Sequence, residues 1–263
     1  MMFRVLARKL EKSLRTRGVL GTLRFGGAWI VAQPNRLLRR AFGATKSLAQ
    51  ADKAFDELYD VDTGGIIPLS ELAIESDNWV YGVHYEAVSP SLDFDELFDG
   101  LDIRYEASVF VDLGCGKGRA LLLAASLPFR RVVGVEFSGD LARVASRNLA
   151  RWPSDKRRCS DASVIHLDAS KYEFPPEPMV VFMYNPFGPE VMAKVLSNLR
   201  VAWGRYGQRV VVVYFTPKHS SLLDEAGFLE RAKQGPGFVI YDTHQARDCD
   251  AVDGCKPGTG TAL

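Results

Sequence analysis

The chain has 263 residues, of which 47% are hydrophobic and 25% are charged, and its formal net charge is +1. These values are ordinary for a globular protein of one domain, or of one domain with an extension. No apolar run approaches the ~20 residues that span a bilayer, which excludes a membrane-spanning helix. The four cysteines have no zinc-site spacing and follow no secretory signal, so we expect reduced thiols in a cytosolic protein. They are Cys115, Cys159, Cys249 and Cys255.

Residues 1–46 are strongly basic. They hold eleven Lys and Arg but a single acid, Glu11, so their formal net charge is +10. The remaining residues therefore carry a formal net charge of −9. Residues 3–14 place apolar side chains at helical spacing with cations between them. Such a helix can lie on an anionic membrane or a partner such as nucleic acid, or it can pack on its own domain. A second helix is expected over 46–59, so residues 1–60 are interpreted as a basic helical extension.

Residues 61–105 are interpreted as an upstream segment that forms a lid on the main domain. Within it, the Asp-Thr-Gly-Gly stretch 62–65 is predicted to be a loop, because paired glycines tolerate unusual backbone angles. It is either a plain loop or part of the lid. Residues 78–90 are rich in aromatic side chains and irregular. Ser91 is expected to cap a helix that runs through Leu101, with acids in its first turns.

From residue 106 onward, short apolar strands alternate with helices. Strands are predicted over 108–113, 131–136, 164–167, 179–184 and 209–215, helices over 119–127, 139–151, 189–202 and 220–226, and a closing hairpin over 228–233 and 238–242. This alternation predicts an α/β fold over residues 106–245, with a mostly parallel sheet of seven strands and helices on both faces. The polar tail 246–263 is expected to be disordered.

The strongest local pattern is the glycine-rich stretch 111–118. A buried strand ends there in a turn over alternate glycines, Gly114, Gly116 and Gly118, which leads into a helix. Glycines let a ligand approach the backbone closely, and the exposed amides at a helix N-terminus favour a carboxylate or another anion. Nicotinamide and flavin enzymes also use such turns, but the third glycine of their fingerprint would fall at Arg119.

Glu136 ends the next predicted strand, 22 residues after Gly114. A carboxylate there can accept hydrogen bonds from both hydroxyls of an adenosine ribose, or it can merely cap the following helix. The alternate glycines, with Asp112 two residues before the first, resemble the first motif of the class I, Rossmann-like S-adenosylmethionine-dependent methyltransferases. The resemblance covers roughly residues 80–242.

This resemblance implies that S-adenosylmethionine is the cofactor and lies over the glycine loop. It also implies that Glu136 binds the ribose and that Asp168 lies beside the adenine amine, although Asp after a strand is also a common turn residue. The expected cofactor contacts are Tyr85, Asp112, Gly114, Cys115, Gly116, Lys117, Gly118, Glu136, Phe137, Asp168, Ala169 and Asn185.

The stretch Asn185-Pro186-Phe187 follows the fourth strand of the domain, where the family places the transferred methyl group. Amino-methylating relatives carry Asn or Asp, two prolines and an aromatic residue here, so this chain, with one proline, matches in part. We expect Asn185 to aim the lone pair of an acceptor nitrogen and Phe187 to stack on a flat or cationic acceptor. An ordinary strand-to-helix turn is the alternative. The predicted catalytic residues are Asn185, Pro186 and Phe187.

Residues 85–90 are similar to short Tyr/Pro segments that lie over the cofactor in the non-SET lysine methyltransferases. The four histidines have no metal-site spacing, and we expect no metal. His84 is a candidate base beside the lid, and His166 is expected to point into the sheet interior or its covering helices.

The sequence therefore predicts a methyltransferase that moves a methyl group from S-adenosylmethionine to an unidentified acceptor. A nitrogen is expected, with protein lysine first and a small-molecule amine or nucleic-acid base next. The alternatives are a nicotinamide-dependent oxidoreductase, and a cofactor-binding interaction module tethered to a membrane or nucleic acid by residues 1–46. A cytoplasmic location, peripheral to a membrane, is expected.

Overall fold

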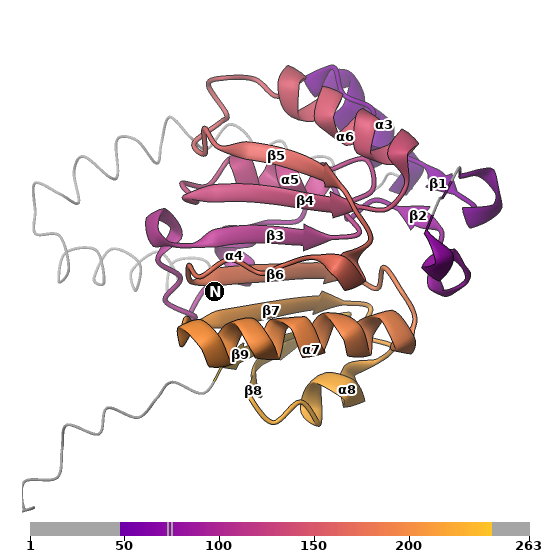
Figure 1. Ribbon diagram of the computed structural model, residues 1–263. Coiled ribbons are helices and arrows are strands. Elements are labelled where there is room, and N and C mark those ends of the chain that lie inside the picture. The colour runs from indigo at the N-terminus through magenta and orange to yellow at the C-terminus, as the bar shows by residue number, and fades with distance from the viewer. Residues whose placement is uncertain (1–47, 73, 75, 244–263) are drawn as a thin grey trace, which may run out of the picture. The chain divides into compact units, whose positions relative to one another are not determined.

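The computed structural model in Figure 1 describes residues 48–72, 74 and 76–243. The predicted basic segment 1–46 and tail 246–263 lie outside these residues. Helix α3, Leu48–Tyr59, confirms the helix expected over 46–59. In the described part of the chain, no helix is both long and apolar enough to cross a membrane.

Seven strands form one large sheet. They are β3 Val109–Leu113, β4 Arg131–Glu136, β5 Ala162–His166, β6 Met179–Tyr184, β7 Val210–Phe215, β8 Leu229–Gly235 and β9 Phe238–Thr243. Their spatial order is β5-β4-β3-β6-β7-β9-β8 (Figure 1), and the strands pair in parallel except that β9 is antiparallel to both β7 and β8. This confirms the predicted mostly parallel sheet and its closing hairpin. A second sheet pairs β1 Ile66–Ile67 with β2 Tyr85–Glu86.

Helices cover both faces of the large sheet, as predicted. They are α4 Phe94–Leu97, α5 Arg119–Ala125, α6 Gly139–Arg151, α7 Pro189–Tyr206 and α8 Ser220–Asp224, with single 3₁₀ turns η1 Leu69–Glu71, η2 Asp77–Tyr81, η3 Tyr105–Ala107 and η4 Ala169–Lys171. Figure 1 shows α7 on one face and α5 on the other. Helix α7 is longer than expected because it continues to Gly207, whose left-handed φ of 66° ends it.

The helix expected from Ser91 to Leu101 is wrong in its extent. Only the four residues of α4 are helical, and its cap is Asp93, whose carboxylate accepts hydrogen bonds from the backbone N–H groups of Asp95 at 3.0 Å and Glu96 at 3.4 Å. Asp and Ser are both good caps, and the sequence held one of each two residues apart.

The orientation expected for His166 is also wrong. Strand β5 is an edge strand, and His166 at its end is exposed. Its Nε2 atom lies 3.1 Å from the backbone oxygen of Phe137. An edge strand has a neighbouring strand on one side only, and every residue of β5 is at least partly exposed.

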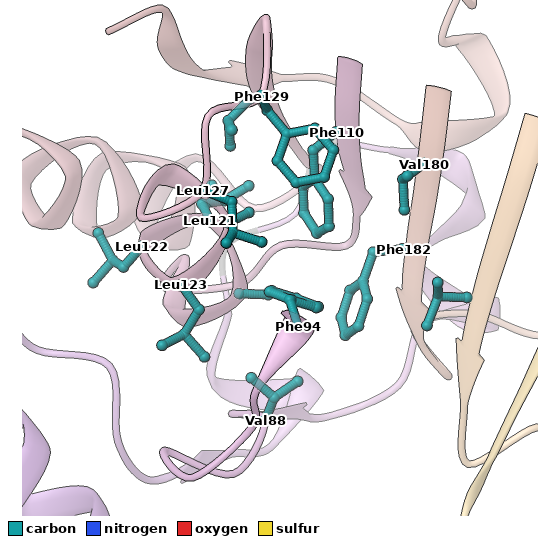
Figure 2. Close-up of a cluster of buried hydrophobic side chains, with 14 of the residues drawn as sticks. Val88, Phe94, Phe110, Leu121, Leu122, Leu123, Leu127, Phe129, Val180 and Phe182 are labelled. Atoms are coloured by element: carbon teal, nitrogen blue, oxygen red, sulfur yellow. The ribbon is translucent and has the colours of Figure 1, made fainter. Parts of the chain in front are cut away.

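Strand β3 lies inside the sheet, between β4 and β6, and is buried along its whole length. Figure 2 shows the cluster on one face, where the rings of Phe94, Phe110 and Phe182 converge with centroids 5.2 to 5.9 Å apart. On the opposite face Val109 and Val111 belong to the second core cluster. Packing on both faces fixes the carboxyl end of β3, and with it the start of the glycine loop.

Candidate active site

The strand order reverses at β3, whose two neighbours β4 and β6 lead the chain away in opposite directions. In open α/β sheets, ligands bind outside the carboxyl ends of the strands at this switch point. Gly114, Gly116 and Gly118 lie there with φ of 77°, 54° and 86°, in the left-handed region that side chains other than glycine adopt only with strain. The backbone N–H of Gly114 donates to the Val135 carbonyl at 2.8 Å, which ties the loop to β4.

Two predicted site residues from other segments lie against this loop. A Cβ atom built on Gly116 would meet the ring of Tyr85 at 2.2 Å, and one on Gly114 would meet Pro186 at 2.4 Å. The Tyr85 hydroxyl donates to the backbone oxygen of Thr63 at 2.5 Å, and burial raises the pKa of Tyr85 well above its usual range. The loop therefore needs glycine because neighbouring groups approach its backbone within contact distance.

Glu136 is buried at the end of β4 and joins two loops. One carboxylate oxygen accepts from the Gly116 N–H at 2.8 Å, and the other accepts from the Ser138 N–H at 2.9 Å. The following helix is capped by Ser138 itself, so Glu136 is not its cap. Burial raises the pKa of Glu136, although the backbone hydrogen bonds oppose this. Each oxygen keeps a further lone pair with which it can accept a ligand hydroxyl.

Asp112 lies beneath the loop and is buried beside Glu136. Burial first, and the neighbouring Glu136 second, raise the pKa of Asp112 well above its usual range. Two carboxyl groups so close together in a dry site do not ionise together readily.

Asp168, after β5, is held by residues that the sequence did not indicate. Its Oδ2 atom accepts from the Ser76 hydroxyl at 2.5 Å and from the Asn78 amide at 2.8 Å, and its Oδ1 atom accepts from the Ser170 N–H at 2.8 Å. Burial acts to raise the pKa of Asp168, but these hydrogen bonds outweigh it and the pKa is lowered. Ala169 is buried next to it. No sequence pattern in the irregular stretch 76–78 indicated that its small polar residues contact Asp168.

The upstream segment crosses the carboxyl ends of several strands. Ile74 forms a β-bridge with Ser138, and Gly82 forms one with Phe187. The Gly188 N–H donates to the Tyr81 carbonyl at 2.7 Å. A Cβ atom on Gly82 would meet the Phe137 ring at 2.9 Å, so the two also pack closely. Residues 74–86 thus connect the loops after β4 and β6, and Figure 1 shows β1 and β2 beside the strand ends.

The loop 62–65 is fastened to the start of α5. The Lys117 ammonium donates to the Asp62 carboxylate at 2.7 Å and to the Gly64 carbonyl at 3.0 Å. Asn148 donates to the carbonyls of both Asp62 and Lys117. The buried Asn148 and the half-buried Lys117 thus hold the stretch 62–65 against the residues that lead into α5.

Arg119 is the main anchor of this region, and it is only 2% exposed. Its Nε atom donates to the Thr63 hydroxyl at 2.8 Å, and its guanidinium forms ion pairs with Asp52 and Asp56 of α3. Asp56 in turn accepts from the N–H groups of Thr63 at 2.8 Å and Gly64 at 2.7 Å. Sequence reasoning used Arg119 only to exclude a dinucleotide fingerprint. A cation directly after a glycine turn was the available signal for this anchor.

At the end of β6, Asn185 adopts a left-handed φ of 42° and is buried. Its side-chain oxygen accepts from the Tyr214 hydroxyl at 3.3 Å, and that hydroxyl accepts from the His219 N–H at 3.3 Å. Pro186 packs on Gly114. Phe187 is buried in the core cluster on the α7 side of the sheet, which favours packing over stacking on an acceptor.

The comparisons with known proteins agree with this geometry. Residues 110–202 match a family model described as a methyltransferase domain. No curated protein matches the chain. Among solved structures, a TehB-like SAM-dependent methyltransferase from Corynebacterium glutamicum is 17% identical over 56% of this chain and 84% of its own, with a TM-score of 0.40. A SAM-dependent methyltransferase from Aquifex aeolicus is 13% identical over 56% of this chain and 87% of its own, with a TM-score of 0.42.

A third solved structure is the 16S rRNA N2 G1207 methyltransferase of T. thermophilus in complex with AdoMet and guanosine. It is 22% identical over 51% of this chain and 36% of its own, with a TM-score of 0.37. At these identities and TM-scores, none of the three structures bears on the acceptor or on individual site residues of this chain.

Residues 110–202 form a methyltransferase domain of the class I, Rossmann-like type. This domain is that of an S-adenosylmethionine-dependent methyltransferase. The residues present fit that cofactor: the three left-handed glycines offer backbone amides, and the carboxylates of Glu136 and Asp168 lie at the ends of adjacent strands. An adenosine with a sulfonium and an amino acid group requires this combination of anion and hydroxyl binding.

Proposed function

We propose that this methyltransferase transfers the methyl group to a nitrogen atom, with the side chain of a protein lysine as the first choice. The placement of Asn185 carries the proposal. Its amide is held at the end of β6 by a left-handed backbone and by the Tyr214 hydroxyl. An amide oxygen has two lone pairs, and one of them remains for the N–H of an acceptor. An acceptor with neither an N–H nor an O–H gains nothing from this group.

The residues of the chain then act mainly by positioning. S-adenosylmethionine, when bound, supplies a methyl group on a positively charged sulfur. Glu136, Asp168 and the loop amides hold it, with Tyr85, Phe137, Cys115, Lys117 and Ala169 as further expected contacts, while Asn185 and Pro186 orient the acceptor nitrogen. Such positioning contributes on the order of 7 kcal/mol or more in well-aligned reactions. The upstream segment, residues 61–105, excludes water as a lid over the carboxyl ends of the strands.

The test is incubation of the purified chain with cofactor labelled on its methyl group and with a host lysate. Mass spectrometry then identifies the atom that carries the label. The proposal expects label on lysine side chains of proteins. Label on a small-molecule amine or on a nucleic-acid base keeps the nitrogen but replaces the acceptor class, and label on oxygen or carbon contradicts the proposal.

The basic segment 1–46 supports a second proposal, that it delivers the enzyme to an anionic surface. Its formal net charge is +10, whereas the remaining residues have a formal net charge of −9. A cytoplasmic enzyme with such a segment binds a membrane surface or nucleic acid electrostatically. Deletion of residues 1–46 is expected to abolish binding to anionic vesicles or to DNA, with cofactor affinity unchanged. Unchanged binding of the truncated chain to both surfaces contradicts this proposal.

A further inference from the structure

Strand β5 forms one edge of the large sheet, and helix α6 lies beside it (Figure 1). A cavity of about 560 Å³ lies between these two elements. None of the residues that line it is an expected cofactor contact. We call the cavity the β5 groove; its lining residues are Gly139, Asp140, Ala142, Arg143, Ser146 and Arg147 on α6, and Val164 and His166 on β5.

The backbone of β5 has hydrogen-bonding groups on the open side of the strand. The Leu167 N–H donates to the Glu136 carbonyl of β4 at 2.9 Å. Backbone groups point alternately to the two sides of a strand, so the odd-numbered residues bond to β4. The N–H and C=O groups of Ala162, Val164 and His166 therefore point away from β4, to a side where no described strand pairs with them. An extended chain can pair with such an edge.

An added strand would place half of its side chains in the groove. Ala162 and Val164 pack against the core cluster that includes Ala145 and Leu149 of α6, so the even-numbered residues of β5 face this helix. A strand next to β5 continues the pleat of the sheet, and every second side chain then lies on the same face. These side chains would lie beside the exposed residues of α6.

The exposed residues of α6 determine which charge the groove attracts. Arg143 and Arg147 lie one helical turn apart, and both are exposed. Arg143 pairs with Asp140, whereas no carboxylate among the described residues forms an ion pair with Arg147. An exposed ion pair is weak, so Arg143 can also contact a ligand. Residues four apart on a helix are about 6 Å apart, and alternate residues of a strand are about 6.6 Å apart. The two arginines therefore match acidic side chains at alternate positions of a strand.

The charges disfavour a second copy of this chain as the occupant. Two-fold pairing of β5 with β5 of another copy would bring Arg143 and Arg147 of each copy toward the same residues of the other. Like charges that face each other across such a contact are destabilising. A nucleic acid has anionic groups for the arginines, but it lacks peptide N–H and C=O groups at the spacing of a strand. An acidic polypeptide matches both the arginines and the edge.

We propose that the β5 groove binds an extended segment of a partner protein with acidic side chains at alternate positions. The segment adds to the sheet as a strand: its backbone pairs with Ala162, Val164 and His166, and its acids pair with Arg143 and Arg147. The groove lies three strands away from β6, where the methyl acceptor is expected. The proposal therefore concerns docking of a partner, goes beyond nitrogen transfer and does not depend on it.

The test uses the full-length protein and a synthetic, end-capped peptide of sequence Thr-Glu-Val-Glu-Val-Glu-Thr. A second peptide has Gln in place of each Glu, and a third keeps the acids but is methylated on its central backbone nitrogens. Amide hydrogen exchange, followed by NMR, reports directly on the edge. We expect the acidic peptide to slow exchange of the Ala162, Val164 and His166 amides, since each gains a hydrogen-bond acceptor. The other two peptides should leave these amides unprotected.

The contribution of the arginines is measured by titration of the same peptide. We expect Arg147→Gln to weaken binding about tenfold, because a charge-assisted hydrogen bond is lost. Arg205→Gln is the matched control, since it removes an exposed arginine from α7, and it should stay within about twofold. An unchanged urea midpoint of Arg147→Gln shows that the variant is folded.

Four results would overturn the proposal. They are equal affinity of the wild type and Arg147→Gln for the acidic peptide, equal binding of the methylated peptide, no protection of the three amides, and protection of those amides before any peptide is added. The last result would mean that a second copy or another segment already covers the edge. Binding of a single-stranded oligonucleotide that depends on Arg147, without binding of the acidic peptide, would also overturn the proposal and assign the groove to nucleic acid.

Discussion

The two halves of the sheet's carboxyl edge are built differently. At the ends of β3, β4 and β5 the groups are buried carboxylates and backbone amides that bond to one another, such as Glu136 with Gly116. At the ends of β6, β7 and β9 they are partly exposed aromatic rings beside the single carboxylate of Glu86. The first half suits a ligand of fixed structure, because its donors and acceptors are fixed by the backbone. The second half also holds the amide of Asn185, which is fixed by a left-handed backbone and by the Tyr214 hydroxyl.

The largest expected effect concerns the anchor beneath the first half. Arg119→Met removes the cation that pairs with Asp52 and Asp56 and leaves both carboxylates without a counter-charge, while Asp56 keeps its hydrogen bonds from Thr63 and Gly64. Breaking a buried pair in this way costs about 3 to 5 kcal/mol. Urea unfolding of the variant should show a loss of this size, and Arg130→Met, at an exposed position, should show almost none. A loss below about 1 kcal/mol for Arg119→Met would mean that the network does not hold the upstream segment.

The next effect tests the ribose contact. Glu136→Ala should lower the affinity for S-adenosylmethionine by about a hundredfold or more, since it removes charge-assisted hydrogen bonds and releases the Gly116 loop. Calorimetry measures the affinity, and circular dichroism checks that the fold survives. Unchanged affinity would show that the ribose lies elsewhere.

The third effect belongs to the second half of the edge. Asn185→Ala should keep cofactor affinity within about twofold but slow methyl transfer about tenfold, because one hydrogen bond that orients the acceptor is lost. The measurement is the single-turnover rate with the labelled acceptor. Tyr214→Phe is a matched variant, since it removes only the hydroxyl that holds the Asn185 amide, and it should give a smaller decrease. Equal rates in all three proteins would remove the role of Asn185.

The smallest effect is a pH dependence of stability. Burial beside Glu136 raises the pKa of Asp112 in the folded state above the unfolded value of about 3.9. The folded protein therefore holds this proton more tightly, and the unfolding free energy falls as pH rises from about 4 through the raised pKa. Asp112→Asn should lose less stability than the wild type as the pH rises through this range. Parallel pH profiles of the two proteins would contradict the raised pKa.

The sequence predicted the first half of the edge far better than the second. The turn over Gly114 to Gly118 and the acid Glu136 are local patterns, because strand, turn and helix follow one another within a few residues. The strands and most helices were predicted for the same reason. The short α4 and the edge position of β5 were not predicted. Two nearby residues could each cap α4, and the order of the strands depends on contacts between residues far apart in the chain.

The missed residues all act across long separations. Ser76 and Asn78 contact Asp168 about 90 residues away, and Arg119 contacts Asp52 over a separation of 67. No spacing rule links such positions. The rings of Tyr184, Phe215 and Phe238 are a similar case, since only the strand register shows that these residues are neighbours.

The most direct test of the whole account is a crystal structure of the protein with S-adenosylmethionine bound. The account predicts the ribose hydroxyls on the Glu136 carboxylate, the amino acid group over Gly114 to Gly118, and the methyl group directed toward Asn185. A cofactor bound away from the glycine loop, with Glu136 still bonded only to Gly116 and Ser138, would contradict it.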